Sequence, residues 1–524
     1  MNVIFLTQNK TLSLFYNIVK MCGNDYNLKK IGFYLADSEY YQYFKKDYPD
    51  INTPAYEKLA EWDIVNKALN KKPDIRNLKD FEKKIGDPYL WNAIIADRRI
   101  YLGREANYKQ DYASRFNHEQ MLSILQIVIE EMEKFFNDVK PDLIISFICV
   151  TIGEYIAHLI AKLRNIPIIN LRPTRIKNYI YGGEDIFEPS RNLERAYKCF
   201  LQSPMEDKLD KDVTQYINKV RNEHAMYEGV LPPQKFSGHK VSGSSLISKM
   251  NKLPYKAVKS IKKICLYNFG QYKHDNHYNG TIRPIIFSKL LKPLKVKYID
   301  FRLRKKYITS DSLGNTDYAF YPLHKEPEVT LLVYSRPYLN QIEVIRSLAR
   351  SLPVGMKLIV KEHPVSIGYR PLSYYKKIIS IPNVILSSPS MTSRDLVNHA
   401  KLICIISGSI GLEALLMKKP VIVLGNAPFN FLPETMIKKV NNIEFLSNFI
   451  HVLLNNHRHD EKALKSYLAA IQQESVPVDF YSTLLGRKGV YQIDHSNYTL
   501  QIKKLAQYLF SKKGSSNLEK CAIN

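Results

Sequence analysis

The sequence predicts an α/β protein with two Rossmann-like domains that face each other across a cleft and a basic insertion between them. Two observations predict this fold class. In both halves of the chain, short apolar runs typical of buried parallel strands alternate with helical segments that carry one apolar face. Between the halves this alternation stops, and the segment there is polar and then rich in lysine. The length of 524 residues is sufficient for two or three domains of ordinary size.

The first domain is expected to cover residues 1–190. Its helix at 120–139 repeats Met121, Leu125 and Val128 at helical spacing, which gives the helix one apolar face. A strand, a helix and another strand then follow in close succession, and this order implies a right-handed parallel crossover. The expected strands are 3–6, 31–35, 140–146 and 166–170, and the second helix is expected at 154–163.

Residues 316–440 are expected to form the second domain. Residues 441–524 are expected to form a helical tail. One possible path of this tail is back to the first domain. Because ligands collect at the carboxyl ends of strands in an open α/β sheet, the residues directly after the strands are candidates for a site. The expected strands are 329–334, 357–360, 384–386, 402–406 and 420–424, and the expected helices are 340–352 and 412–417.

The insertion, residues 191–315, carries most of the charge. Between Lys235 and Lys306 there are 18 Lys or Arg and two Asp, so more than half of the formal net charge of +26 lies in this segment. Apolar and lysine positions alternate there at helical spacing, which favours contact with an anionic membrane surface. A solvated basic surface is an alternative. A nucleic-acid partner is not expected, because no nucleic-acid-binding motif accompanies the charge.

The composition excludes several classes of protein. Hydrophobic residues at 45% and charged residues at 24% are typical of a folded chain and exclude a disordered one. No apolar run reaches the ~18 residues that span a bilayer. The first residues, 1–8, lack the features of a signal peptide, so we expect a cytoplasmic protein. The six cysteines form no CxxC pair, which is typical of reduced thiols.

The first candidate site follows the strand at 357–360 and consists of Lys361, Glu362, His363 and Pro364. Pro364 restricts His363 to an extended backbone, so the imidazole should project from the end of the strand. An imidazole can donate a hydrogen bond to a phosphate or protonate a leaving oxygen. We therefore interpret His363 as a donor-binding and candidate catalytic residue, with Lys361 beside it. A histidine satisfied by local hydrogen bonds is the structural alternative.

The second candidate site follows the strand at 402–406. Ser407, Gly408, Ser409 and Gly411 form a turn that opens a helix. Glycine lets the backbone approach a ligand, and a helix N-terminus presents free N–H groups to an anion. Glu413 lies one turn further, where a carboxylate can accept hydrogen bonds from ribose hydroxyls. Together with His363, this turn predicts a site for the phosphate and ribose of a nucleotide sugar. A tight connection without a ligand is the alternative.

A resemblance covers roughly a hundred residues of this half. It is carried by the ordered stretches Leu323-His324-x-x-Pro327-Glu328, Val360–Pro364, Arg370, Ile381–Val384, Ser407–Ala414 and Lys419–Ile422. This series resembles the capsule polysaccharide biosynthesis family, which includes Kdo transferases of the GT-B fold. The resemblance implies that His363, Ser407 and Ser409 bind the donor phosphate and that Glu413 binds the ribose.

The first domain would then be the acceptor side. Residues 140–146 and 166–170 resemble GT-B sugar-nucleotide enzymes, including UDP-GlcNAc 2-epimerases. Arg172 and Arg175 follow the second stretch and could bind an anionic group, although surface salt bridges explain them equally well. The chain has Ser146-Phe147-Ile148 where the epimerases have His-Gly-Asp, and this difference counts against epimerase chemistry.

The catalytic base is not identified by the sequence. Asp37, Asp97 and Glu154 are weak candidates, because an acid near a strand end more often caps a helix or faces solvent. Asp210-Lys211-Asp212 matches a DxD metal motif only formally, since it lies in a charged helical stretch. The resemblance implies a transferase that needs no metal, and no other cofactor is expected.

The sequence therefore predicts a cytoplasmic, peripheral membrane glycosyltransferase. Its donor would be a nucleotide sugar, with a CMP-activated acidic sugar such as CMP-Kdo favoured, and its acceptor a lipid-linked or polysaccharide glycan. Two alternatives stay open. One is a sugar-nucleotide 2-epimerase, and the other is a non-catalytic GT-B module that acts as a scaffold for capsule machinery.

Overall fold

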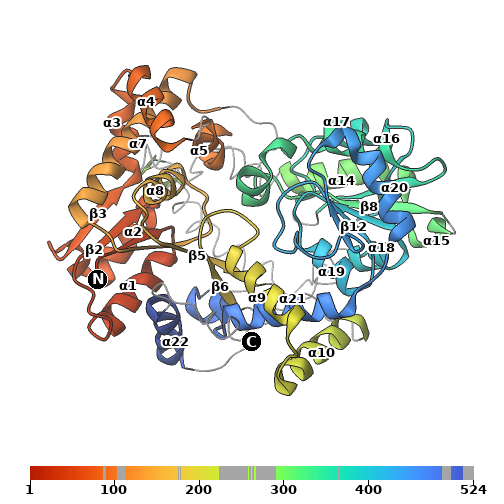
Figure 1. Ribbon diagram of the computed structural model, residues 1–524. Helices are drawn as coiled ribbons and strands as arrows, with labels where there is room; N and C mark the ends of the chain where they lie inside the picture. The colour runs from red at the N-terminus through yellow and green to blue at the C-terminus, as the bar shows by residue number, and fades with distance from the viewer. Residues whose placement is uncertain are drawn as a thin grey trace.

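The computed structural model describes residues 1–86, 90–102, 114–174, 176, 179–222, 258, 261–262, 265–266, 269, 291–314, 316–363, 366–486 and 497–511. Two seven-stranded sheets form the centres of two α/β domains that lie side by side (Figure 1). The predicted fold class, two Rossmann-like domains in a GT-B-like arrangement, is confirmed by the strand order of both sheets. Most of the basic segment 235–306 lies outside the described residues.

The first sheet has the order β14-β6-β5-β4-β1-β2-β3. Five of its strands are parallel, whereas β6 is antiparallel to β5, and β14 is antiparallel to β6. The strand order reverses between β1 and β4, and such a switch point is where doubly wound sheets bind ligands. The strands are β1 (Val3–Thr7), β2 (Ile31–Leu35), β3 (Tyr56–Ala60), β4 (Leu143–Phe147), β5 (Ile168–Pro173), β6 (Ile180–Gly183) and β14 (Ser475–Val476).

Helices cover both faces of this sheet, because apolar residues of its buried strands alternate between two cores. One core includes α3, α7 and α8, and the other includes α1, α2 and the C-terminal helix. The helices are α1 (Thr11–Cys22), α2 (Ser38–Asp47), α3 (Glu61–Leu69), α4 (Ile75–Ile85), α5 (Trp91–Ala96), α6 (Arg98–Tyr101), α7 (His118–Val139) and α8 (Ile152–Leu163), with the 3₁₀ turn η1 (Pro49–Asn52).

The second sheet is entirely parallel in the order β13-β12-β11-β8-β9-β10-β7, and it reverses between β8 and β11. The strands are β7 (Tyr307–Ile308), β8 (Tyr318–Pro322), β9 (Lys357–Lys361), β10 (Val384–Ser387), β11 (Leu402–Ile405), β12 (Val421–Val423) and β13 (Ile437–Lys439). Around it lie α14 (Lys292–Leu303), η4 (Arg304–Lys306), α15 (Ser310–Leu313), η6 (Arg336–Tyr338), α16 (Gln341–Ser351), α17 (Leu372–Ile379), α18 (Ser393–His399), α19 (Ile410–Leu416), η8 (Ile443–Phe445) and α20 (Leu446–Asn456).

One predicted strand is wrong. Residues 329–334 are helical and contain the π-helical turn η5 (Thr330–Tyr334), which contacts α5 of the first domain. The residues Thr330 to Val333 are all buried, so the run is apolar on every side, and periodicity cannot separate a buried strand from a buried helix in such a run. The strand that enters the sheet is β8, which lies just before this run.

The end of the chain links the two domains. The helix α21 (Glu461–Glu474) packs against α9 (Arg191–Gln202) and α10 (Asp207–Asn222) below the two sheets in Figure 1. From there the chain enters the first domain, where β14 pairs with β6 and α22 (Tyr498–Ser511) packs against α1. The turn η9 (Phe480–Leu484) lies between them. A return of the tail to the first domain is therefore confirmed. In the described part of the chain, no helix has the length and apolar character needed to cross a membrane.

Candidate functional site

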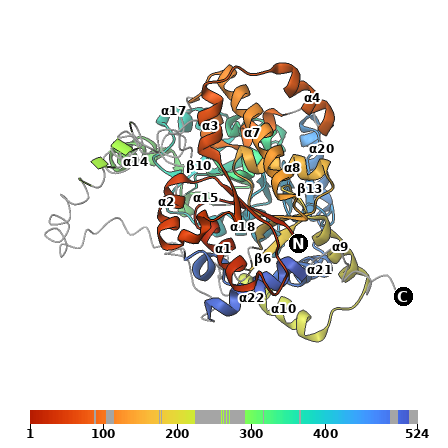
Figure 2. The same cartoon turned by 90° about the vertical axis from the view of Figure 1, so that its left-hand side faces the viewer.

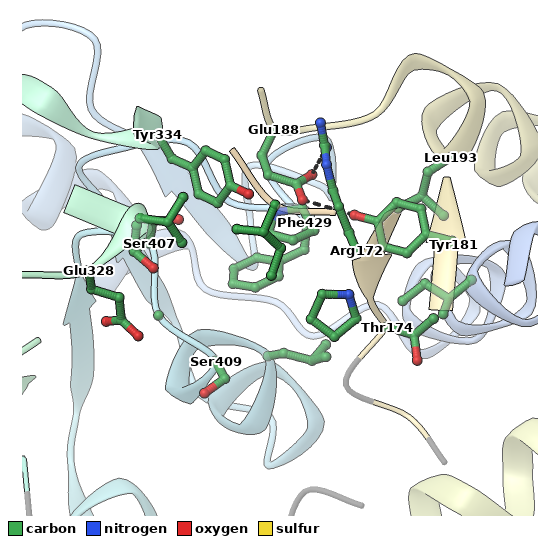
Figure 3. A pocket seen from close by; sticks show the side chains of 18 of the residues that line it. Arg172, Thr174, Tyr181, Glu188, Leu193, Glu328, Tyr334, Ser407, Ser409 and Phe429 are labelled. Atoms are coloured by element: carbon green, nitrogen blue, oxygen red, sulfur yellow. Dashed lines mark hydrogen bonds and ion pairs between the residues drawn. The ribbon is translucent and has the colours of Figure 1, made fainter. Parts of the chain in front are cut away.

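A pocket of about 380 Å³ lies between the two domains, at the carboxyl ends of their central strands (Figure 3). The first domain contributes Ile148, which follows β4, and residues 172–174 at the end of β5. The second domain contributes residues 407–409, which follow β11. Both sheets therefore direct a strand end toward the same space, as expected for a ligand site of doubly wound domains.

The wall of the second domain is the loop Ser407–Ser409. The Ser407 hydroxyl donates a hydrogen bond to the Asn426 carbonyl, which fixes this loop against the residues after β12. Ser409 is exposed and its side chain makes no capping hydrogen bond at the start of α19. The Ser409 hydroxyl is thus available to an anionic group in the pocket, whereas the Gly411 N–H in the first turn of α19 donates to the Gly408 carbonyl at 3.1 Å.

His324 lies behind this loop, and the sequence analysis did not identify it as a site residue. It follows β8, the strand next to β11, so it occupies the switch point of the second sheet. A methyl group on Gly408 would come within 3.2 Å of His324 Cε1, so the absence of a side chain at Gly408 lets the loop lie against the imidazole. The position of His324 directly after an apolar run is the sequence feature that could have identified it as a site residue.

Gly411 and Glu413 do not line the pocket. A methyl group on Gly411 would lie 2.4 Å from Ile405 Cδ1 and 2.7 Å from Phe429 Cζ. Gly411 therefore allows α19 to pack closely on β11. Glu413 is half-buried, and this burial raises its pKa above the ordinary value for a glutamate.

The motif at the end of β9 is divided between the interior and the surface. Lys361 is 4% exposed, and burial lowers the pKa of its ammonium group to about 8. Within the described part of the chain, no hydrogen bond or ion pair holds this ammonium group. His363 lies beyond the end of the strand and is exposed, although the protein on its inner side displaces water and lowers its pKa. Neither residue lines the pocket.

Glu362, between them, belongs to a buried ion cluster. Its carboxylate pairs with Arg370 and accepts a hydrogen bond of 2.8 Å from the Tyr375 hydroxyl. Arg370 also donates to the His324 carbonyl at 2.7 Å and pairs with Glu326 at 3.2 Å. One fully buried guanidinium thus joins the loop after β8 to the loop after β9. The cluster fixes the backbone of both histidine-bearing loops.

The wall of the first domain is built around Arg172, which is 1% exposed. Its guanidinium pairs with Glu188 at 3.0 Å and donates through Nε to Asn170 Oδ1 at 3.1 Å. The Tyr181 hydroxyl donates to Glu188 at 2.9 Å. Burial raises the pKa of the Glu188 carboxyl, although the attraction of Arg172 opposes this shift. Figure 3 shows Arg172 and Glu188 on the opposite side of the pocket from Ser407 and Ser409.

Glu188 and Tyr181 were also missed by sequence reasoning. The sequence feature that could have indicated this wall is the pair of glycines at the end of β6, where Gly183 pairs with Asn170 in the neighbouring strand. A methyl group on Gly183 would lie 2.7 Å from Arg172 Cζ, so a glycine there leaves room for the guanidinium. The other arginine predicted for this region, Arg175, lies outside the described residues.

The three candidate bases named from the sequence do not line the pocket. Asp97 is fully buried and pairs with Arg99 at 2.6 Å. Asp37 caps α2 by accepting from the Tyr40 N–H at 2.8 Å. Glu154, the third candidate, accepts a hydrogen bond from the Val150 N–H. Each of the three acids therefore has a local structural partner.

Glu154 lies at the switch point of the first sheet. It closes the capping box of α8 and accepts from the backbone N–H groups of Val150 at 2.8 Å and Thr151 at 3.0 Å. Gln8, which follows β1, donates to the other carboxylate oxygen. Burial raises the pKa of Glu154 to about 7. This carboxyl group holds the loop that carries Ile148 into the pocket.

The described residues contain no group of three or more His, Cys, Asp or Glu side chains that could hold a metal ion. The formal DxD segment lies within α10, where Asp210 pairs with Lys465 at 2.9 Å.

Comparisons with known proteins match parts of the chain of different extent. Residues 219–439 match the family described as Capsule polysaccharide biosynthesis protein. A stretch of 99 residues is 34% identical to the capsule polysaccharide export protein KpsS of Escherichia coli and covers 18% of this chain and 25% of KpsS. The chain thus aligns with about a quarter of the length of this curated relative.

Many solved structures are similar to this chain at low identity, and two of them are representative. The first is KpsC of Thermosulfurimonas dismutans, described as a β-Kdo 2,7 transferase, with 11% identity, a TM-score of 0.33 and coverage of 65% of this chain and 80% of KpsC. The second is UDP-GlcNAc 2-epimerase of Methanocaldococcus jannaschii, with 14% identity, a TM-score of 0.23 and coverage of 90% of this chain and 98% of the epimerase. Because both TM-scores are low, the fold assignment depends on the strand order of the two sheets.

Proposed function

We propose, on the premise that residues 219–439 belong to the capsule polysaccharide biosynthesis protein family, that this chain is a glycosyltransferase of capsule or surface glycan assembly. One observation carries the proposal. The Gly/Ser loop before α19 and the Arg172–Glu188 pair line one pocket from two different domains. A pocket lined by two domains suits a transferase, because one domain can hold the donor and the other the acceptor, and the two substrates must meet in one orientation with water excluded.

The donor is proposed to bind on the second domain. The Ser409 hydroxyl can bind a phosphate. Lys361 and His363 lie outside the lining of the pocket, and we propose that they extend the donor site along the same edge of the sheet with a buried cation and an imidazole. A buried ammonium group gains more from an anionic partner than an exposed one, because water competes less for it. A CMP-activated acidic sugar such as CMP-Kdo is the favoured donor, and the proposal needs no metal.

The acceptor, a lipid-linked or polysaccharide glycan, is proposed to enter from the first domain. There Arg172 would orient an anionic group, while Glu188 is our candidate for the base that accepts the acceptor's proton. A carboxyl group with a raised pKa is a better base near neutral pH than an exposed one. Glu328, on the side of Ser407 in Figure 3, is the second carboxylate that lines this space.

The location proposed for the protein is the cytoplasmic face of the membrane, with the basic segment 235–306 in contact with anionic lipids. A lipid-linked acceptor would make this location useful, since both substrates would then be within reach of one pocket.

The test is calorimetric titration of the full chain with CMP, UDP and GDP. We expect one nucleotide to bind selectively and the affinity to fall by about tenfold or more in His363→Ala, which corresponds to the loss of one hydrogen bond to a charged group. His451→Ala is the matched control, because His451 is an exposed histidine on α20. Binding of no nucleotide by the folded protein would overturn the donor-site assignment.

A second measurement separates the alternatives. A 2-epimerase would convert its nucleotide sugar to an isomer with no acceptor present, whereas a transferase would require the acceptor. A scaffold protein would turn over no donor and would tolerate His363→Ala.

A further inference from the structure

The helix α14 has apolar residues on two opposite faces. Ile299 and Leu303 are buried and join the core that contains Tyr321 and Leu323 of the second domain. On the other face, Leu294, Tyr298 and Phe301 are 65%, 52% and 63% exposed, and Leu291, just before the helix, is 51% exposed. These four residues are spaced by three, four and three positions, so they form one stripe along the helix. We call residues 291, 294, 298 and 301 the α14 stripe.

Cations flank the stripe. At about 100° per residue, Lys297 lies on one side of it and Arg302 on the other. Arg304, Lys305 and Lys306 continue the positive charge at the C-terminal end, and all five of these side chains are exposed. Between residues 291 and 306 the only acidic residue is Asp300. Exposed apolar residues between cations are typical of helices that lie in the headgroup region of a membrane.

The helix is held firmly to the second domain. Lys295 Nζ donates to the Tyr369 carbonyl at 2.9 Å, and Lys292 Nζ lies 3.7 Å from the centre of the Tyr369 ring. A methyl group on Gly368 would lie 2.6 Å from Val296 Cγ2, so the backbone there is in close contact with α14. Tyr369 precedes Arg370, which fixes the loop of His363. Figure 2 shows α14 at the outer edge of the molecule, away from α9 and α21.

We propose that the α14 stripe docks this protein on an anionic lipid bilayer, with its apolar side chains inserted and the flanking cations against lipid phosphates. The inference deepens the proposed function by naming the element that contacts the membrane and the lipid chemistry that it recognises. A second copy of this face is a poorer partner, because two cationic surfaces repel each other. Nucleic acid would bind the cations but leave the exposed apolar side chains in water.

The test is co-sedimentation of the full chain with vesicles of phosphatidylcholine alone and of phosphatidylcholine with phosphatidylglycerol. We expect binding to the anionic vesicles to exceed binding to the neutral ones, and to fall at least about tenfold in Leu294→Ser/Tyr298→Ser/Phe301→Ser. The matched control is Phe445→Ser/Val452→Ser. It removes two exposed apolar residues, one directly before α20 and one within it. Nucleotide affinity should be the same in the triple variant and in the unmodified protein, so a failed donor site and a failed membrane contact give different results.

Three outcomes would overturn the proposal. Equal sedimentation of the triple variant and the unmodified protein would mean that α14 does not contact lipid. A change from dimer to monomer in the triple variant, measured by light scattering, would identify the stripe as a self-association surface. Binding of duplex RNA that is lost in the triple variant, without anionic vesicle binding, would assign the face to nucleic acid.

Discussion

At the scale of single residues, neighbours in one short motif have different tasks. Glu362 is buried and pairs with Arg370, whereas His363, the next residue, is exposed at the end of β9. Because Arg370 also binds the His324 carbonyl, one ion cluster fixes the backbone next to two histidines. Removing one partner of a buried ion cluster is costly, since it leaves an unpaired charge in the interior. Loss of activity on mutation of Glu362 or Arg370 would therefore be a positioning effect.

The raised pKa of Glu154 predicts a pH dependence of stability. The folded pKa is about 7, above the ordinary 4.5, so the unfolded chain releases this proton first as the pH rises. The stabilisation is therefore complete below the unfolded pKa and is lost as the pH rises through about 7. We expect the free energy of unfolding to fall between pH 5 and pH 8 by about 2 to 3 kcal/mol more in the unmodified protein than in Glu154→Gln.

Urea denaturation of both proteins at these two pH values measures this difference. His158, whose pKa burial lowers to about 4, and Lys361, whose pKa is about 8, are common to both proteins and cancel in the comparison. Parallel pH profiles of the two proteins would contradict the shift assigned to Glu154.

At the scale of elements, the sequence predicts those whose periodicity is clear. The helix α7 begins at a capping box of Asn117 and Gln120. The parallel strands β1, β2, β4, β5, β9, β10, β11 and β12 lie where apolar runs predict them, whereas the central strand β8 was not predicted. The edge strands β3, β7, β13 and β14 were not predicted. Charged residues interrupt the apolar pattern in β3 and β13, and β7 and β14 have only two residues each. The error at residues 329–334 has a related cause, since a run buried on all sides has no polar face.

The packing of α19 on β11 separates stability from binding. Gly411→Ala places a methyl group on Ile405 and Phe429, and overpacking of this kind costs about 1 to 3 kcal/mol. We expect it to lower the free energy of unfolding and, by moving α19, to weaken nucleotide binding. Ser409→Ala removes an exposed hydroxyl that caps nothing, so we expect weaker nucleotide binding with stability unchanged within about 0.5 kcal/mol.

Urea denaturation and calorimetric titration of these two variants measure both quantities. If Gly411→Ala were as stable as the unmodified protein, the close approach of α19 to β11 would be wrong. If Ser409→Ala bound nucleotide normally, Ser409 would not belong to the donor site.

At the scale of the whole molecule, the site depends on how two domains are placed. Sequence reasoning named residues 407–409 and Arg172 because each follows a strand, and the structure brings them to one pocket. It could not name Glu188, which faces Arg172 only after β6 turns back antiparallel to β5. Nor could it name Glu328, because its place in the pocket follows from the packing of the neighbouring helical turn on the other domain. Contacts between domains leave no period in the sequence.

The return of the tail predicts how the first domain responds to truncation. Ten buried apolar residues of one of its two cores come from residues 476–510. The ring centre of Phe480 lies 4.8 Å from that of Phe147, at the end of β4. Each of the nine that are Val, Ile, Leu or Phe contributes about 1.5 to 3 kcal/mol when fully buried, and a domain is stable by only about 5 to 15 kcal/mol in total. A chain that ends after Glu474 should therefore fail to fold its first domain and be recovered in inclusion bodies.

A chain that ends after Ser511 is the matched control, because it retains β14, η9 and α22 with all of these contacts. Soluble yield and the thermal unfolding transition measure both truncations, and we expect the control to unfold at the temperature of the full chain. A soluble, cooperatively unfolding chain without residues 475–511 would mean that the tail only rests on the first domain. With the expected result, the tail is part of that domain's core, so β6 and the Arg172 wall that it supports depend on residues some three hundred positions further along the chain.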